Sequence, residues 1–345
     1  MSEGADVSDA SPIRWGFIGA SLWASRYLIP AVAAQLDAVG VGVFSSSPER
    51  GEEYAAANGL HRAYASLEEL LGDEDIDAVY ISTTNDLHAE QTIAAAAAGK
   101  HVLCEKPLAL SLDDALRMRE ACAAAGVVFA TDHHLRAAPT IATMRELVAA
   151  GEIGELVSGR VFHARGLGEE FKGWRLDRPE AGGGVVLDIT VHDADVVRFL
   201  FADEVAEVTA LGANQGLAAP GLEDSVMGVM RMRGGQLVSF HDAFTVPDAS
   251  TGVELYGTEG ALIGRDVIDG EPVGQVFLRR GDDAREIEIA ERKPIYVEAV
   301  RRFDAAVRGE GAPLASGDDG IATLAIATAV QESARSGRAV AVPQT

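Results

Sequence analysis

The sequence predicts an α/β domain followed by an α+β domain, and three observations support this prediction. In the first part of the chain, short apolar runs alternate with helical stretches, as in a doubly wound parallel sheet. In the second part, most strands alternate with period two, which indicates a mostly antiparallel sheet covered by helices on one face. The length of 345 residues suits two such domains. We expect a disordered tail over residues 1–11, the first domain over 12–136 and the second over 137–345.

Composition and charge exclude several classes of protein. With 48% hydrophobic residues and no biased tract, the chain has the composition of a globular protein. The net charge of −24 repels polyanions, so we expect neither nucleic acid nor membrane as a partner. No apolar run is long enough to span a bilayer, and residues 1–11 lack the features of a signal peptide. Two cysteines, Cys104 and Cys122, cannot build a disulfide framework, so we expect a cytoplasmic protein.

The first strand is predicted over residues 13–19 and leads into a helix. Between them, Gly19, Ser21 and Ala24 occupy the three places of the G-x-G-x-x-G/A turn, which binds the pyrophosphate of a dinucleotide. Serine at the second place brings a side chain where phosphate approaches, and its hydroxyl is able to donate to that phosphate. The alternative is a generic glycine-rich turn. The strand before this turn and the helix after it favour a Rossmann domain. We expect Leu22, in the same turn, to contact the cofactor as well.

The second strand, predicted over residues 39–44, ends in hydroxyl side chains where NAD-binding proteins carry a carboxylate. Ser45 and Ser46 are able to donate hydrogen bonds to a ribose 2′-phosphate, and Arg50 supplies positive charge. The sequence therefore favours NADP(H) as the cofactor. The alternative is that this segment merely begins the next helix, and the two roles are compatible.

A later strand, predicted over residues 76–82, is followed by Thr83, Thr84, Asn85 and His88. These residues lie at the same edge of the sheet as the glycine turn, because the carboxyl ends of parallel strands share one edge. This segment has two possible roles: it contacts the cofactor, or it caps the next helix. Both interpretations stay open. The other elements predicted in this domain are helices that end near 58 and 99, helices over 66–71 and 111–125, and strands over 62–64 and 127–130.

The segment H-V-L-C-E-K-P, residues 101–107, is the most informative stretch of the first domain. Its apolar run predicts a buried parallel strand, and Glu105 and Lys106 follow at the edge where doubly wound sheets bind ligands. Pro107 disfavours the helical region for Lys106 and so holds the lysine on an extended backbone. The alternative is a strand that ends in a solvated ion pair.

Two adjacent histidines, His133 and His134, follow the last strand of this domain. Neighbouring side chains on an extended chain point in opposite directions, and no carboxylate or cysteine spacing completes a ligand set. We therefore expect no metal site.

The second domain carries one glycine-rich segment, G-G-G-V-V-L-D-I-T-V-H-D-A-D, residues 182–195. Its helix places Asp188 and His192 four residues apart, hence on one face and within reach of each other. An aspartate that accepts from one imidazole nitrogen leaves the other free for proton transfer, although such a pair is more often a surface feature. Trp174 and Arg175, just upstream, either clamp a ligand or form a structural lid. The other predicted elements are strands over 156–164, 205–213, 226–232, 236–244, 252–256, 261–263, 273–279 and 339–342, and helices over 140–150, 295–308 and 318–336.

Taken together, these segments resemble the Gfo/Idh/MocA family of pyridine-nucleotide sugar oxidoreductases. The resemblance covers nearly the whole chain after the tail and rests on W-G-F-I-G-A-S, S-T-T-N-D-L-H, E-K-P and G-G-x-x-x-D-x-x-x-H, in the family's order and spacing. More narrowly, the chain is similar to a subgroup of NADP-dependent reductases that convert 1,5-anhydro-D-fructose to 1,5-anhydro-D-mannitol. The resemblance implies that Lys106 and His192 flank a substrate carbonyl and that Asp188 orients the histidine. It also implies that Trp174 and Arg175 lie near the nicotinamide and the substrate.

From these residues and this resemblance we expect an NADPH-dependent reductase of a keto sugar, with either Lys106 or His192 giving the proton. Two alternatives stay open: another NAD(P)-dependent sugar or inositol dehydrogenase of the same family, and a non-catalytic regulator that binds NADP. The resemblance is compatible with a monomer and with a homo-oligomer formed through the open face of the second sheet. One departure from the family is Leu22-Trp23, because smaller residues are common in that turn.

Overall fold

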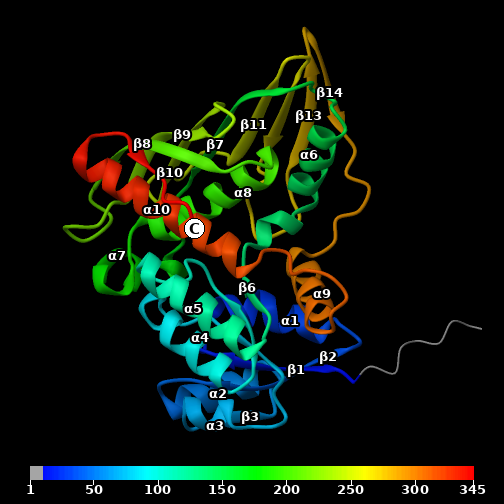
Figure 1. Ribbon diagram of the computed structural model, residues 1–345, viewed down its shortest axis with the longest axis vertical. Helices are drawn as coiled ribbons and strands as arrows, with labels where there is room; N and C mark the ends of the chain where they lie inside the picture. The colour runs from blue at the N-terminus through cyan, green and yellow to red at the C-terminus, as the bar shows by residue number, and fades with distance from the viewer. Residues whose placement is uncertain (1–10) are drawn as a thin grey trace, which may run out of the picture.

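The computed structural model describes residues 11–345 and contains two sheets, one in each half of the chain (Figure 1). The expected tail over residues 1–11 lies outside the described residues apart from Ser11. The long helix α10 (Gly317–Ser336) runs between the two halves, so the end of the chain lies against both (Figure 1). Among residues 11–345, no helix has both the length and the apolar character that crossing a membrane requires.

Six parallel strands form the first sheet in the order β3-β2-β1-β4-β5-β6, which confirms the predicted Rossmann domain. Trp15, Phe17 and Tyr80 are fully buried in it, because helices cover both faces. The strand order reverses between β1 and β4, which is where doubly wound sheets bind their ligands. The strands are β1 (Ile13–Ile18), β2 (Ala38–Phe44), β3 (Arg62–Tyr64), β4 (Ala78–Ile81), β5 (His101–Cys104) and β6 (Phe129–Thr131). The helices are η1 (Ala24–Leu28), α1 (Ile29–Ala33), α2 (Pro48–Ala57), α3 (Leu67–Leu71), η2 (Asn85–Leu87), α4 (His88–Ala97), α5 (Leu112–Ala125) and η3 (His134–Ala137).

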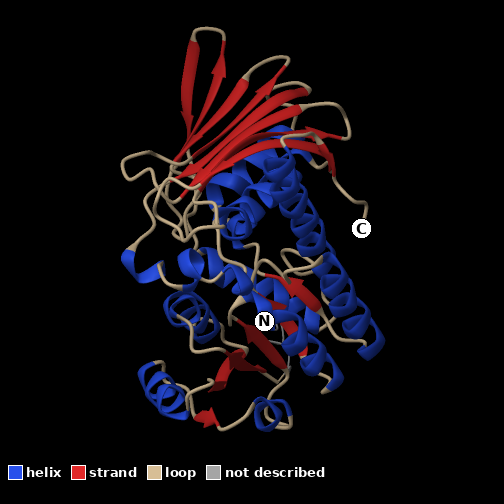
Figure 2. Ribbon diagram, turned by 90° about the vertical axis from the view of Figure 1, so that its left-hand side faces the viewer, coloured by secondary structure: helices blue, strands red, loops and turns tan. Residues whose placement is uncertain are grey.

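Nine strands form the second sheet in the order β14-β13-β12-β11-β7-β10-β9-β8-β15, and only β10 and β7 run parallel among the described pairs. Helices cover one face of this sheet, as predicted, while the other face carries none among the described residues (Figure 2). Its strands are β7 (Leu156–Ala164), β8 (Val205–Ala213), β9 (Ser225–Met232), β10 (Leu237–Ala243), β11 (Gly252–Gly257), β12 (Ala261–Arg265), β13 (Gln275–Arg280), β14 (Asp283–Ile287) and β15 (Val340–Ala341). The remaining helices are α6 (Pro139–Ala149), η4 (Glu169–Phe171), α7 (Trp174–Asp177), η5 (Pro179–Ala181), η6 (Val186–Thr190), α8 (Val191–Phe201) and α9 (Ile295–Val307).

Three local features differ from the sequence-based expectation. Strand β14 was not predicted, because this exposed edge strand has the sequence D-A-R-E-I and no period-two apolar pattern. Two helices begin with a π-helical turn, η1 after the glycine turn and η6 after the triple glycine. Helix α9 lies near the C-terminus yet packs against α1, and its Asp304 accepts a hydrogen bond of 3.2 Å from the indole of Trp15.

Candidate active site

A cavity of about 1000 Å³ lies at the carboxyl edge of the first sheet and is lined by residues from both domains. Its size suits a ligand-binding pocket, and its place between β1 and β4 is the ligand site of doubly wound sheets. Of the site residues predicted from the sequence, all but Ala24 line this cavity. Ala24 is fully buried behind the turn, where a small residue lets the helix pack closely on the strand.

The glycine turn at the end of β1 has the geometry that its sequence predicts. Gly19 has φ of +103°, and a Cβ there would lie 3.0 Å from the carbonyl oxygen of Ser82. The hydroxyl of Ser21 accepts from the backbone N–H of Ala24 at 3.0 Å and donates to Ser82 at 2.9 Å. Ser21 therefore caps the following helix, which leaves its backbone rather than its hydroxyl to face a phosphate group. Leu22 is half exposed on the cavity wall.

The segment after β2 brings positive charge to the same turn. Arg50 reaches across and donates through Nη2 to the carbonyl oxygen of Ala20. Ser47 accepts from the backbone N–H of Arg50 at 3.3 Å, so the segment also begins helix α2, as the compatible alternative predicted. Ser45 and Ser46 line the cavity beside this guanidinium. Two hydroxyls and one guanidinium suit an anionic group of a cofactor.

The segment after β4 connects the cavity to both domains. Asn85 donates at 3.2 Å to the carbonyl oxygen of Gly182, and no side-chain cap bond from it is present among the described residues. His88 is fully buried, and its Nδ1 lies 2.8 Å from the carbonyl oxygen of Pro107. Burial lowers the pKa of His88, so its neutral ring braces the turn that follows Lys106. Thr83 and Thr84 line the cavity.

Lys106 forms an ion pair with Asp188 inside the cavity. Its Nζ donates to the Asp188 carboxylate at 2.9 Å and to the Asp188 backbone carbonyl at 2.7 Å. The lysine and aspartate side chains are only 10% and 13% exposed, so this pair is not the solvated surface pair of the alternative reading. Lys106 and, next, Arg175 hold the pKa of Asp188 far below its usual value despite burial, which alone would raise it.

This contact corrects the predicted role of Asp188. Among the described residues no hydrogen bond joins Asp188 to His192, and the aspartate holds Lys106 instead. The physical reason is competition for the carboxylate, because Lys106 at 2.9 Å and Arg175 at 3.2 Å are cationic donors and bind it more strongly than a neutral imidazole does.

Glu105 lies behind Lys106 in a buried acidic cluster. Its Oε1 accepts from the phenol of Tyr80 at 2.5 Å, and the same phenol lies 3.2 Å from the Asp132 carboxylate. Burial raises the pKa of Glu105 and of Asp132, and Lys106 opposes this rise at both. Glu105 also lines the cavity, and its Oε2 accepts a hydrogen bond of 3.2 Å from the backbone N–H of Lys106.

Trp174 and Arg175 line the cavity from α7, as a ligand clamp requires. The guanidinium carbon of Arg175 lies 4.7 Å from the centre of the Trp174 ring, and its Nε donates to Asp188 at 3.2 Å. Two cations therefore converge on one carboxylate at this wall of the cavity.

His192 is surrounded by other histidine rings. The centres of the His134, His133 and His163 rings lie 5.2, 6.2 and 6.4 Å from its own. Its Nδ1 is buried and has no hydrogen-bond partner among the described residues. Burial, and then the charge of Lys106, lower the pKa of His192 well below its usual value. The imidazole is therefore neutral at neutral pH.

We expect this neutrality to be observable in solution. Because the folded-state pKa of His192 lies well below the unfolded value of about 6.5, the ring stays unprotonated as pH falls from 8 to about 6. Imidazole chemical shifts, assigned with a His192→Gln variant, should show no midpoint for this residue in that range. A midpoint near 6.5 would contradict the proposed environment.

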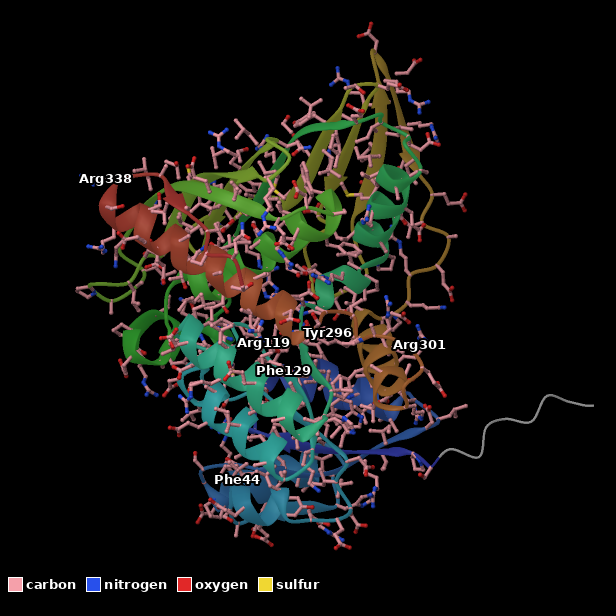
Figure 3. All side chains as sticks on the ribbon, in the orientation of Figure 1. Phe44, Arg119, Phe129, Tyr296, Arg301 and Arg338 are labelled. Carbon is pink, nitrogen blue, oxygen red and sulfur yellow. The ribbon has the colours of Figure 1, made fainter. Side chains whose placement is uncertain are left out.

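The sequence reasoning assigned no site role to several residues that line the cavity, Trp23 and His134 among them. Trp23 donates from Nε1 to the phenol of Tyr296 at 2.7 Å, so the bulky turn is accommodated by aromatic packing on α9. Figure 3 shows Tyr296 where the two domains meet. His134 stacks on Tyr296, whereas His133 bonds to Thr323 on α10. In residues 11–345, no three His, Cys, Asp or Glu side chains are arranged to hold a metal ion.

Two family models match this chain. Residues 13–133 match the model described as an oxidoreductase family with an NAD-binding Rossmann fold. Residues 141–263 match the model described as the GFO/IDH/MocA C-terminal domain. The two matches correspond to the parallel sheet and to the first part of the second domain.

Known proteins are similar over nearly the full length. The 1,5-anhydro-D-fructose reductase of Ensifer adhaerens is 49% identical over 329 residues, which cover 95% of this chain and 98% of that protein. The aldose-aldose oxidoreductase of Caulobacter crescentus, solved with glycerol, has a TM-score of 0.88 at 26% identity and covers 96% of this chain and 99% of its own. A levoglucosan dehydrogenase solved with NADH has a TM-score of 0.86 at 26% identity, with 97% and 100% coverage. The similarity supports a sugar oxidoreductase that uses a nicotinamide cofactor.

Proposed function

We propose that this chain, which belongs to the Gfo/Idh/MocA family of oxidoreductases, is a cytoplasmic NADPH-dependent reductase of a keto sugar. The substrate that we favour is 1,5-anhydro-D-fructose, which the reaction would convert to 1,5-anhydro-D-mannitol. The observation that carries the proposal is the buried Lys106–Asp188 pair beside His192, in a cavity that also contains the cofactor turn. The relative at 49% identity supports the choice of sugar.

In the proposed reduction, Lys106 and His192 have different roles at the substrate carbonyl. When bound, the nicotinamide supplies a hydride to the carbonyl carbon. Lys106 gives a proton to the oxygen that becomes a hydroxyl, because Asp188 accepts two hydrogen bonds from its ammonium group and the third N–H is available to the substrate. His192, neutral and adjacent, donates a hydrogen bond to the same oxygen. This assignment chooses Lys106 over His192 as the proton donor.

Other residues position the two ligands. Arg175 is held by Asp188 and lies over Trp174, so these two side chains form a rigid wall against a sugar ring. The backbone of the turn from Gly19 to Ser21 faces the pyrophosphate. Ser46 and Arg50 contact the ribose 2′-phosphate.

A screen of keto sugars tests this function. We expect NADPH consumption with 1,5-anhydro-D-fructose and formation of the corresponding polyol. Oxidation of a sugar or of an inositol, with no reduction of any keto sugar, would instead favour a dehydrogenase of the same family. Tight NADPH binding without turnover of any sugar would favour the non-catalytic regulator.

Exchange of Arg50 tests the choice of cofactor. Loss of a charge-assisted hydrogen bond costs about 1.5 to 3 kcal/mol, so Arg50→Glu should raise the Kd of NADPH by about 10- to 100-fold and leave that of NADH nearly unchanged. Cofactor titrations monitored by fluorescence measure both constants. Arg26→Glu is the matched control, because it changes the net charge equally at an exposed residue outside the cavity. Equal losses for both cofactors would refute the assignment of Arg50 to the 2′-phosphate.

A further inference from the structure

A pair of fully buried carboxyl groups lies behind the cavity wall, and the mechanism above does not use it. Asp193 on α8 and Asp242 on β10 are both 0% exposed, and their side chains lie within hydrogen-bonding reach of each other. Asp193 Oδ2 and Asp242 Oδ1 have no donor among the described residues. Two carboxylates side by side in a dry interior cannot both be charged, because the repulsion is not screened.

A single shared proton explains this arrangement. Burial raises the pKa of both groups, and the charge of Asp193 raises that of Asp242 further. The proton therefore stays on Asp242, which donates to Asp193 and satisfies the two oxygens that lack other donors. Asp242 Oδ2 accepts from the hydroxyl of Thr190 at 2.5 Å. Every oxygen of the pair then has a partner once His163 is included.

His163 is the group that this pair presents to the cavity. It lies on β7 directly opposite Asp242 in the parallel pairing with β10, and both side chains point to the covered face of the sheet. Its Nδ1 lies 2.9 Å from Asp193 Oδ1. Because Asp193 is an acceptor, Nδ1 carries the hydrogen and Nε2 keeps its lone pair. Burial lowers the pKa of His163 to about 4, so the ring is neutral.

The free nitrogen of His163 is a hydrogen-bond acceptor in the same cavity as the donors Lys106 and His192. The side chain lines the cavity, and Nε2 makes no hydrogen bond within the described chain. The centre of the ring lies 6.4 Å from that of His192. Lys106 and His192 suit a carbonyl oxygen, whereas a lone pair beside them suits a hydroxyl group on the same substrate.

We propose that His163 accepts a hydrogen bond from a hydroxyl on the carbon next to the reacting carbonyl, and that Asp193 and Asp242 are its positioning residues. This inference rests on the proposed keto-sugar reduction and narrows its substrate class to α-hydroxy ketones. A site built to pair with a hydroxyl discriminates strongly against the analogue that lacks it, because the buried acceptor is then left without a donor.

The test compares 1,5-anhydro-D-fructose with its 3-deoxy analogue, in which the neighbouring hydroxyl is absent. We expect His163→Ala to lower kcat/KM for the hydroxylated ketone by roughly 10- to 100-fold, mainly through KM, and to change the value for the deoxy analogue by less than about threefold. His241→Ala is the matched control, because His241 precedes Asp242 on the same strand and packs on Phe162 at the other face. His241→Ala should leave unchanged the ratio of kcat/KM for the hydroxylated ketone to kcat/KM for the deoxy analogue.

Variants of the pair separate positioning from folding. Asp193→Leu removes the group that accepts from His163 Nδ1, so it should raise KM as His163→Ala does. Asp193→Asn keeps an acceptor and Asp242→Asn keeps a donor, so both variants should keep the preference for the hydroxylated ketone over its 3-deoxy analogue. Long-range ¹H–¹⁵N spectra should show His163 protonated at Nδ1 in the wild type and not in Asp193→Leu. This second measurement does not depend on turnover.

The outcomes distinguish this inference from the function on which it rests. Wild-type turnover of the ketone, with equal losses on both substrates in His163→Ala, would overturn the inference alone. A His163 ring protonated at Nε2 in the wild type would overturn it as well. A wild type that reduces neither ketone would overturn the proposed function, and the inference with it.

Discussion

Replacement of Lys106 by alanine is expected to lower kcat by about 10³- to 10⁴-fold, with little change in the Kd of NADPH. The ammonium group stabilises the oxygen more as it becomes an alkoxide than in the bound ketone, so its loss falls on the transition state. It also supplies the proton, and general acid catalysis contributes about 10²- to 10⁴-fold by itself. Single-turnover kinetics under saturating ketone measure the chemical step directly.

Two controls accompany this variant. Lys293→Ala removes an exposed lysine that pairs with Glu291 outside the cavity, and it should retain full activity. Lys106→Ala leaves Asp188 in contact with Arg175, so we expect a folded protein with an unchanged circular dichroism spectrum. A folded Lys106→Ala variant that keeps kcat within tenfold of the wild type would rule out the lysine as the proton donor.

Replacement of His192 by alanine is expected to lower kcat by about 10²-fold, because one N–H donor to the developing alkoxide is lost. His192→Gln retains an N–H donor without a titrating ring, so it should retain more activity than His192→Ala. Both variants should bind NADPH normally, because the proposed cofactor contacts are made by the glycine turn, Ser46 and Arg50 and not by His192.

The double variant of Lys106 and His192 tests whether the two residues act as a unit. In the proposed reduction both groups contact one oxygen, so the double alanine variant should fall little below Lys106→Ala alone. Fully additive losses would show that the residues act at different steps. A His192→Ala variant with normal kcat and a raised KM would instead identify the histidine as a binding group only.

Local patterns were sufficient to predict most of the parallel sheet and to select residues that line one cavity at its carboxyl edge. Gly19 needs positive φ, and the E-K-P segment ends a buried strand, so both signals are contained in a few neighbouring residues. Pairing of consecutive strands then places them at one edge. The same reasoning could not fix the partner of Asp188, because that partner is Lys106, which comes from the other domain and is brought to Asp188 only by tertiary packing.

Residues that reach the cavity through tertiary packing were the ones that the sequence did not reveal. His163 is the clearest example, since only the parallel pairing of β7 with β10 sets it opposite Asp242. A buried histidine near the end of an otherwise apolar strand face was the one available signal. Tyr296 lies more than 250 residues from Trp23, with which it bonds, and no local pattern connects them. The edge strand β14 was missed because polar residues carry no period-two signal.

Transfer of deuterium tests the central claim most directly. The wild-type protein is incubated with 1,5-anhydro-D-fructose and NADPH that carries deuterium at the transferred position of C4, and the product is examined by mass spectrometry and NMR. We predict a polyol with one deuterium on the former carbonyl carbon, formed by the wild type and at least about 10³-fold more slowly by Lys106→Ala. A product without deuterium at that carbon, or NADPH consumption with no polyol, would contradict the account.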